Sequence, residues 1–272
     1  MQSNSTAIVY NPTLYYAKKR LFAILTTDLT PAQLDRVQEL FGIGATMCSP
    51  SPAEELFISD RREWSDLSHA ELKRAYLEAD PLLVIDSRTP DDGGIWYLDR
   101  FADEDDIKDG QAESLNTLYK IRMDIRDVVI QYTNYSIANT DIREALDAVD
   151  VPYPTPDGFD QETLFCVGFD HIKERYMNPT WVTATPDELE ESTALEDISN
   201  FVPRPEIVYR VKENIARQAG LKSAWMIAVD TRKEVELPDG SKKTFPLGSK
   251  IIQSRYDPEA SIPVYKRPNG SL

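Results

Sequence analysis

The sequence predicts an α/β or α+β protein with a mixed sheet and flanking helices. Two short apolar runs, LFAILT at 21–26 and LLVID at 82–86, have the length and composition of buried strands. A helical pattern follows the first run, which is the order of a parallel βα unit. A third run, IWYLDRF at 95–101, follows the second after a short turn and is expected to return antiparallel. These observations together predict a sheet with both parallel and antiparallel pairs.

Capping residues bound the helices expected in the first half of the chain. Thr30, followed by Pro31 and by Gln33, marks the start of one helix, and Gly42 is expected to end it. Ser68 and Glu71 form the same kind of cap for a second helix, which ends before Pro81. The other elements expected before residue 150 are a short helix at 53–58, a strand at 118–123, and helices at 125–132 and 140–149, the last one capped by Thr140.

Three prolines at 152–156 and the glycine at 158 interrupt all periodicity. We therefore expect an α/β domain at 1–150, a proline-rich connector at 151–160 and a second α+β lobe at 161–272, with the two lobes either packed as one unit or standing apart. In the second lobe we expect strands at 163–169, 225–230 and 249–254, a short acidic helix from 185, a helix at 206–219 and a hairpin turning at Pro238-Asp239-Gly240, with the chain from 257 lying along the surface.

The chain is acidic. Its 272 residues include 30 Lys and Arg against 46 Asp and Glu, a formal net charge of -16. Such a charge repels phosphate backbones and anionic lipid head groups, so neither nucleic acid nor a membrane is an expected partner. The amino-terminal residues lack the pattern of a secretory signal, and the sequence has no apolar run long enough to span a bilayer. A cytoplasmic location is therefore expected.

Reactive side chains are scarce. The two cysteines, Cys48 and Cys166, are expected to be free thiols, and with only two histidines no metal or other cofactor is expected. The nucleophile elbow, the phosphate loop and the kinase motifs are absent. Gly42-Ile43-Gly44 lacks the third glycine of a dinucleotide-binding turn, and the acidic stretch 103–110 does not have the ligand spacing of a calcium loop.

The candidate catalytic residues lie at the expected strand ends. Asp86 ends the run 82–86, and Asp170 with His171 follows the run 163–169. Apolar strands of α/β folds deliver their terminal polar residues to the rim of the sheet, where ligands bind. A carboxylate there, partly desolvated by Tyr132 and Trp96, would have a raised pKa. The plain alternative is that these side chains hydrogen-bond loop backbones.

The candidate ligand-binding residues lie between the helices expected at 125–132 and 140–149. Tyr132, Asn134, Tyr135 and Asn139 would supply aromatic stacking and amide contacts to a ligand. The alternative is structural, because Asn139 and Asp141 are suitable caps for the helix that follows.

Three segments carry a resemblance: Leu82-Leu83-Val84-Ile85-Asp86, Ser136-Ile137-Ala138-Asn139-Thr140-Asp141 and Asp147-Ala148-Val149-Asp150. Over about residues 20–150 they resemble an uncharacterised bacterial domain family of unknown function. In that family a strand ending in Leu-Leu-Val-Val-Asp precedes a short helix, an Asn-rich turn, a Ser-Ile-Ala-Asn-x-Asp motif and an acidic helix. The chain departs from it by an insertion around 87–118, and the resemblance implies no activity.

Two functions follow as expectations. The first is an acidic binding or interaction protein that recognises a protein partner or a small molecule, with a homo-oligomer left open. The second is a small-molecule enzyme, an isomerase, cyclase or lyase, that uses carboxylates and tyrosines in a cleft between the lobes. A pocket with a desolvated carboxylate would favour the enzyme, and an exposed apolar patch would favour the binding protein.

Overall fold

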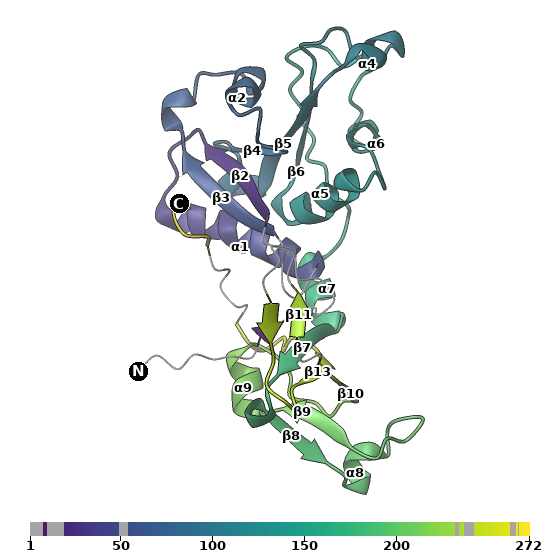
Figure 1. Ribbon diagram of the computed structural model, residues 1–272. Coiled ribbons are helices and arrows are strands. Elements are labelled where there is room, and N and C mark those ends of the chain that lie inside the picture. The colour runs from purple at the N-terminus through teal and green to yellow at the C-terminus, as the bar shows by residue number, and fades with distance from the viewer. Residues whose placement is uncertain are drawn as a thin grey trace. The chain divides into compact units, whose positions relative to one another are not determined.

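The computed structural model describes residues 8–9, 19–48, 54–231, 234–236, 242–261, 265 and 267–272. The chain divides into two compact units (Figure 1). The larger unit comprises residues 19–45, 54–169 and 265–272, and the smaller unit comprises residues 1–18, 46–53 and 170–264. Each unit has a sheet of its own.

The larger unit is built on a five-stranded mixed sheet with the strand order β3-β2-β4-β5-β6. Strand β2 pairs in parallel with β3 and β4, whereas β5 pairs antiparallel with β4 and β6. The strands are β2 (Lys19–Leu25), β3 (Glu54–Asp60), β4 (Leu82–Ile85), β5 (Gly94–Phe101) and β6 (Leu118–Asp124). The expected mixed sheet with flanking helices is therefore confirmed.

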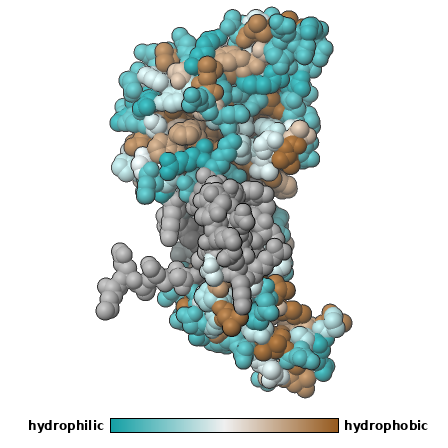
Figure 2. Space-filling model, viewed as in Figure 1, coloured by the Kyte–Doolittle hydropathy of each residue, from teal (hydrophilic) through white to brown (hydrophobic). Residues whose placement is uncertain are grey.

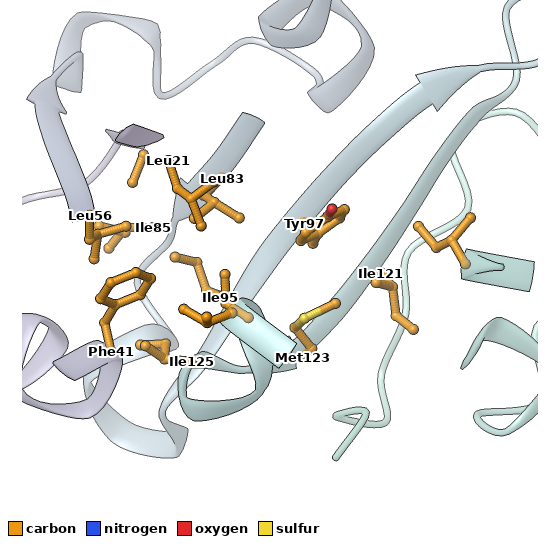
Figure 3. Packing of buried hydrophobic residues seen from close by; sticks show 14 of the residues in the cluster. Leu21, Phe41, Leu56, Leu83, Ile85, Ile95, Tyr97, Ile121, Met123 and Ile125 are labelled. Atoms are coloured by element: carbon orange, nitrogen blue, oxygen red, sulfur yellow. The ribbon is translucent and has the colours of Figure 1, made fainter. Parts of the chain in front are cut away.

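Helices cover both faces of this sheet. The helices α1 (Pro31–Cys48), α5 (Val128–Ser136) and α6 (Ile142–Asp147) contribute to one apolar cluster, and α2 (His69–Ala75) contributes to the other. Side chains along β2 alternate between the two faces of the sheet. Leu21 packs in the same cluster as Phe41 of α1 (Figure 3), whereas Ile24 on the other face joins the cluster of Leu72. Each such buried side chain contributes about 1.5–3 kcal/mol to folding. The shorter helices are η1 (Arg62–Trp64), α3 (Thr89–Asp92), α4 (Glu104–Lys108) and η2 (Ile125–Asp127).

The sequence predicted that Gly42 ends α1. This prediction is wrong, because the helix continues to Cys48. A Cβ on Gly42 would lie 2.5 Å from the Cβ of Tyr265, and a Cβ on Gly44 would lie 1.9 Å from the carbonyl oxygen of Arg126. The two glycines therefore allow close packing against α1 and do not act as a stop. The cap at the other end is confirmed, since Thr30 Oγ1 accepts from the backbone N–H of Gln33 at 3.3 Å.

The helix expected at 53–58 is also wrong, because these residues belong to β3. Leu56 and Ile58 are fully buried and alternate with more exposed residues, which is the period of a strand. The carboxyl-terminal segment lies along this strand. Tyr265 Oη accepts from the N–H of Leu56 at 3.1 Å, and Ser271 Oγ accepts from the N–H of Ile58 at 2.9 Å. The last residues thus cover a sheet edge.

The proline-rich segment is not a connector between the two units. Val151 belongs to the apolar core of the larger unit, and Thr155 forms a bridge with Ala112. Asp157 accepts a hydrogen bond from Thr117 Oγ1 at 2.7 Å. Local backbone restriction by proline is therefore compatible with tight packing here, and the expected boundary at 151–160 lies inside the larger unit, which continues to Phe169.

The smaller unit has a four-stranded antiparallel sheet with the order β1-β7-β13-β10 and two separate strand pairs. Its strands are β1 (Ile8–Val9), β7 (Thr180–Ala184), β8 (Leu189–Ser192), β9 (Val208–Val211), β10 (Ala228–Asp230), β11 (Glu234–Glu236), β12 (Lys242–Thr244) and β13 (Lys250–Ser254). Its helices are α7 (His171–Met177), η3 (Pro186–Glu188), α8 (Leu195–Ile198) and α9 (Glu213–Gln218).

Two elements expected in the second lobe are corrected. Residues 163–169 form no strand; Phe165 makes only an isolated bridge with Met123 of β6. The helix expected at 206–219 is divided, because Val208–Val211 pairs with β8 and only Glu213–Gln218 is helical. The two strands of the expected hairpin are confirmed as β11 and β12, whereas the turn at Pro238-Asp239-Gly240 lies outside the described residues.

Candidate functional site

Asp86 follows β4 and is held by its surroundings. Its carboxylate accepts from the backbone N–H groups of Arg88 at 2.9 Å and Thr89 at 3.0 Å, and from Trp96 Nε1 at 3.1 Å. Burial raises the pKa of Asp86, but the charge of Arg122 and these hydrogen bonds outweigh burial, so the pKa is lowered overall. The expected raised pKa is therefore wrong, and the geometry favours a role in fixing the loop after β4.

Asp170 and His171 lie in the smaller unit, whereas Asp86 lies in the larger one. Asp170 is the N-cap of α7, and its carboxylate accepts from the N–H of Lys173 at 3.0 Å. His171 is the first residue of that helix and is buried. Residues 163–169 before them do not form the expected strand, so Asp170 and His171 do not follow a strand end. Cys166 is an exposed free thiol of the larger unit.

The expected ligand-binding residues are brought together. Tyr132, Tyr135 and Asn139 line one pocket of about 530 Å³ in the larger unit, here named the acidic pocket. Asn134 lies in a smaller pocket of about 170 Å³ that shares Tyr135 and Thr140 with it. A pocket of several hundred cubic ångströms is of the size that small molecules occupy.

Strand β5 and helix α5 position the aromatic side of the acidic pocket. Tyr132 and Tyr135 are three residues apart on α5 and therefore share a helix face. The ring of Tyr135 meets the ring of Tyr97 edge-on, with centroids 5.6 Å apart. Asp99 lies two residues after Tyr97 on β5, and both line the acidic pocket, although the pairing of β5 with β6 is irregular between Leu98 and Phe101.

Negative charge dominates the polar side of the acidic pocket. Four carboxylates line it, those of Asp80, Asp99, Asp141 and Glu144, against two cations, Lys19 and Arg100. Arg100 is already paired with Asp106, with Nη2 and Oδ1 3.1 Å apart, and Asp141 is paired with Arg143 at 2.7 Å. Within the described part of the chain, no ion pair joins Asp80 or Asp99 to a cation. Asp80 and Asp99 therefore have no salt-bridge partner among the described residues, although the buried Lys73 lies close enough to interact with both.

The desolvated carboxylate is Asp99. Burial and then the charge of Asp80 raise its pKa from the ordinary 3.8 to about 6, although Arg100 and Lys73 oppose the change. Lys73 is buried and donates from Nζ to the carbonyl oxygen of Ala79 at 2.7 Å. Burial also raises the pKa of the Tyr135 hydroxyl, and Asp99 adds to the effect. Perturbed groups gathered in one pocket are typical of functional sites.

Comparison of the chain with protein-family models, with curated proteins and with solved structures finds no match. Among the residues that the structure describes, no group of histidine, cysteine, aspartate and glutamate has the arrangement of a metal site. In the same residues, no helix is both long and apolar enough to cross a membrane.

Of the residues that line the acidic pocket, sequence reasoning named Tyr132, Tyr135 and Asn139. It did not name Asp80, Tyr97 and Asp99. The signal for Asp99 was present in the run IWYLDRF. Alternation places Ile95, Tyr97 and Asp99 on one face of this strand, and Ile95 is fully buried. A carboxylate on the apolar face of a strand is an exception to the pattern of burial and marks a candidate site. Asp80 gives no comparable signal, because it lies outside a strand.

Proposed function

We propose that the protein is a binding protein whose acidic pocket receives a positively charged group. The observation that carries this proposal is the pair Asp80 and Asp99, which face a pocket lined by tyrosines and form no ion pair within the described residues. An ammonium or guanidinium group would compensate the negative charge through charge-assisted hydrogen bonds. The ring of Tyr135 would add cation–π attraction, whereas the ring of Tyr132 already carries the amine of Lys19, 4.4 Å from its centroid.

The ligand class is a cation of modest size, either free or carried by a basic side chain of a protein partner. The volume of about 530 Å³ accommodates a small organic cation. The formal charge of -16 favours the approach of cations over a longer range and slows the approach of anions. On the face shown in Figure 2, hydrophobic residues of the larger unit occur in small patches among hydrophilic ones. Recognition by charge is therefore better supported than docking through a broad apolar surface.

Titration calorimetry with spermidine and, separately, with a lysine-rich peptide tests this proposal and distinguishes the two sources of the cation. We expect Asp99→Asn to weaken binding of the true ligand by about 10- to 100-fold, the loss of one charge-assisted hydrogen bond. Asp66→Asn removes an exposed carboxylate elsewhere on the larger unit and should leave binding unchanged. If both variants weakened ligand binding equally, the cause would be the lower net negative charge of the protein, and a specific site at Asp99 would be contradicted.

The enzyme remains the second candidate because of one observation, the carboxyl of Asp99 with a pKa of about 6 beside tyrosine hydroxyls. A carboxyl group with this pKa can accept and return a proton near neutral pH. The support comes from a pocket within the larger unit and not from a cleft between lobes. Mass spectrometry of a bound cation after incubation tests it: a product formed by the wild type and lost in Asp99→Asn favours the enzyme.

A further inference from the structure

A second pocket, of about 710 Å³, lies in the larger unit and has a lysine in its wall. It is named the lysine pocket and is lined by residues that include His69, Arg74, Lys120 and Asp157. Lys120 is opposite Leu98 in the pairing of β6 with β5, so it projects from the sheet face opposite to that of Tyr97 and Asp99. The lysine pocket is therefore distinct from the acidic pocket, and the inference does not rest on the proposed function.

The amine of Lys120 has few partners. Its Nζ lies 3.3 Å from Nδ1 of His69 and 4.7 Å from the ring centroid of Trp96, which is fully buried. Within the part of the chain that the structure describes, no carboxylate pairs with it. Burial lowers the pKa of Lys120, and of the nearby charges Asp160 opposes this change whereas Arg88 adds to it. The neutral amine is thus populated at lower pH than in an exposed lysine.

Lys73 shows what a structural buried lysine looks like in the same protein. Its Nζ donates to the carbonyl oxygens of Ala79 at 2.7 Å and Leu98 at 3.4 Å, and it is not part of the lysine pocket. Lys120 makes no such carbonyl contacts in the described structure and borders a space that a ligand can enter.

The neighbours of Lys120 remain neutral or are already engaged. Burial, and then the charge of Lys120, lowers the pKa of His69 to about 3, so this imidazole is neutral and Nδ1 can accept a hydrogen bond. Asp157 accepts from Ser114 and Thr117, and Asp160 lies 3.9 Å from Arg88.

Arg74 contributes the second cation. Its Nη2 donates to Asn116 Oδ1 at 2.8 Å, and no ion pair involving it occurs among the described residues. An exposed guanidinium of this kind is suited to binding a carboxylate. The lysine pocket thus combines an amine of lowered proton affinity with a site for an anion.

We propose that Lys120 is a nucleophile that forms a Schiff base with a small anionic carbonyl compound bound in the lysine pocket. The lone pair of the neutral amine attacks the carbonyl carbon, and a C–N bond forms while the π electrons move to oxygen. A proton passes from nitrogen to that oxygen, which gives a carbinolamine. The carbinolamine hydroxyl takes up one proton from solvent and leaves as water, while the nitrogen lone pair forms the C=N bond of the protonated imine. Arg74 binds the carboxylate of the compound, and His69 orients the amine.

Borohydride trapping of the full-length protein tests this proposal, with pyruvate as the probe and propanal as its neutral counterpart. Borohydride reduces the imine to a stable secondary amine, and peptide mass spectrometry locates it. We expect the pyruvate adduct on Lys120, and we expect its loss in Lys120→Arg. Lys108→Arg removes an exposed lysine of α4 and should keep the adduct. Arg74→Gln should lower trapping of pyruvate by about 10-fold or more and change trapping of propanal little.

A second measurement uses only the wild-type protein and so does not depend on the folding of a variant. The rate of acetylation by acetic anhydride is followed for Lys120 and Lys108 as the pH is varied. We expect Lys120 to reach its half-maximal rate at a lower pH than Lys108, because only the neutral amine reacts. Coincident profiles, or pyruvate adducts spread evenly over exposed lysines, would overturn the proposal.

Discussion

At the scale of single residues, Asp99 couples the charge of the acidic pocket to the stability of the fold. In the folded protein it takes up a proton near pH 6, whereas the ordinary pKa of an aspartate is 3.8. Between these pH values the folded state binds more protons than the unfolded chain. The free energy of unfolding contributed by Asp99 therefore falls as the pH rises through this range and remains lower above it.

We expect the stability of the Asp99→Asn variant, relative to the wild type, to be higher near neutral pH than at about pH 4, because an asparagine side chain cannot ionise. The two pKa values, 3.8 and about 6, correspond to about 3 kcal/mol at most, and solvent screening reduces this to about 1–2 kcal/mol. Urea unfolding of both proteins at several pH values measures the difference. A wild-type-to-variant difference that does not change with pH would contradict the raised pKa.

Arg122 is the other residue whose charge governs the larger unit. It is 1% exposed, and its guanidinium forms two hydrogen bonds with Asp92, at 2.6 and 2.9 Å, and a longer contact with Asp86 at 3.5 Å. Its replacement would leave the partly buried carboxylate of Asp86 and the more exposed one of Asp92 without their cation. Breaking a buried pair from one side is strongly destabilising.

We expect Arg122→Met to lower the free energy of unfolding by about 3–5 kcal/mol. Arg36→Met is the matched control, because Arg36 pairs with Glu39 on the surface and such pairs contribute about 0–1 kcal/mol. Chemical denaturation of both variants gives the comparison. If both variants lost a similar free energy of unfolding, burial of Arg122 would not make its ion pairs more stabilising than a surface pair.

At the scale of elements, the starts of α1 and α2 were predictable from sequence because caps are local. Ser68 and Glu71 form the expected reciprocal cap of α2, and the apolar runs at 82–86 and 118–123 form strands as expected. Strand β3 and strand β9 were not predictable in this way. Their residues are fixed by pairing with β2 and β8, contacts that depend on distant parts of the chain. Contacts between distant parts of the chain also bring Asp80 to the acidic pocket and Arg122 to Asp86, so the sequence alone predicted neither.

The cap of α6 shows the limit of even a local prediction. The sequence offered Thr140 as the N-cap and also Asn139 and Asp141 as caps; the structure confirms Asp141, whose carboxylate accepts from the N–H of Arg143 at 2.9 Å. The Glu144 side chain accepts in return from the N–H of Asp141 at 3.2 Å. Thr140 Oγ1 is buried and has no hydrogen-bond partner in the described structure.

We expect Asp141→Ala to lower the free energy of unfolding by about 0.5–2 kcal/mol through loss of the cap. Thr140→Val, which keeps the shape and removes the hydroxyl, should cost little or be stabilising, because an unsatisfied polar group is lost. Thermal denaturation of the pair measures the contrast. If Thr140→Val were the more damaging change, the cap would be assigned to the wrong residue.

At the scale of the whole molecule, the order of segments along the chain differs from the order of the folded units. The larger unit is completed by residues 265–272, so the chain leaves it after Phe169 and returns at Tyr265. The three prolines at 152–156 suggested a domain boundary at 151–160. Proline restricts the local backbone, however, and does not determine which segments pack together. Two sets of contacts hold residues 265–272 on the larger unit. The ring of Tyr265 packs against that of Phe41 with centroids 5.6 Å apart, and the segment forms hydrogen bonds with β3.

We expect deletion of residues 265–272 to destabilise the larger unit by at least about 2 kcal/mol, because a half-buried tyrosine and the hydrogen bonds of this segment to the backbone of β3 are lost. The deletion also leaves the N–H groups of Leu56 and Ile58 without their partners and exposes a sheet edge. Denaturation followed by near-ultraviolet circular dichroism measures the loss, and light scattering reports edge-to-edge association. Asn269→Ala, at an exposed position of the same segment, should leave both readouts unchanged. A truncated protein with the wild-type midpoint and no association would show that β3 needs no cover.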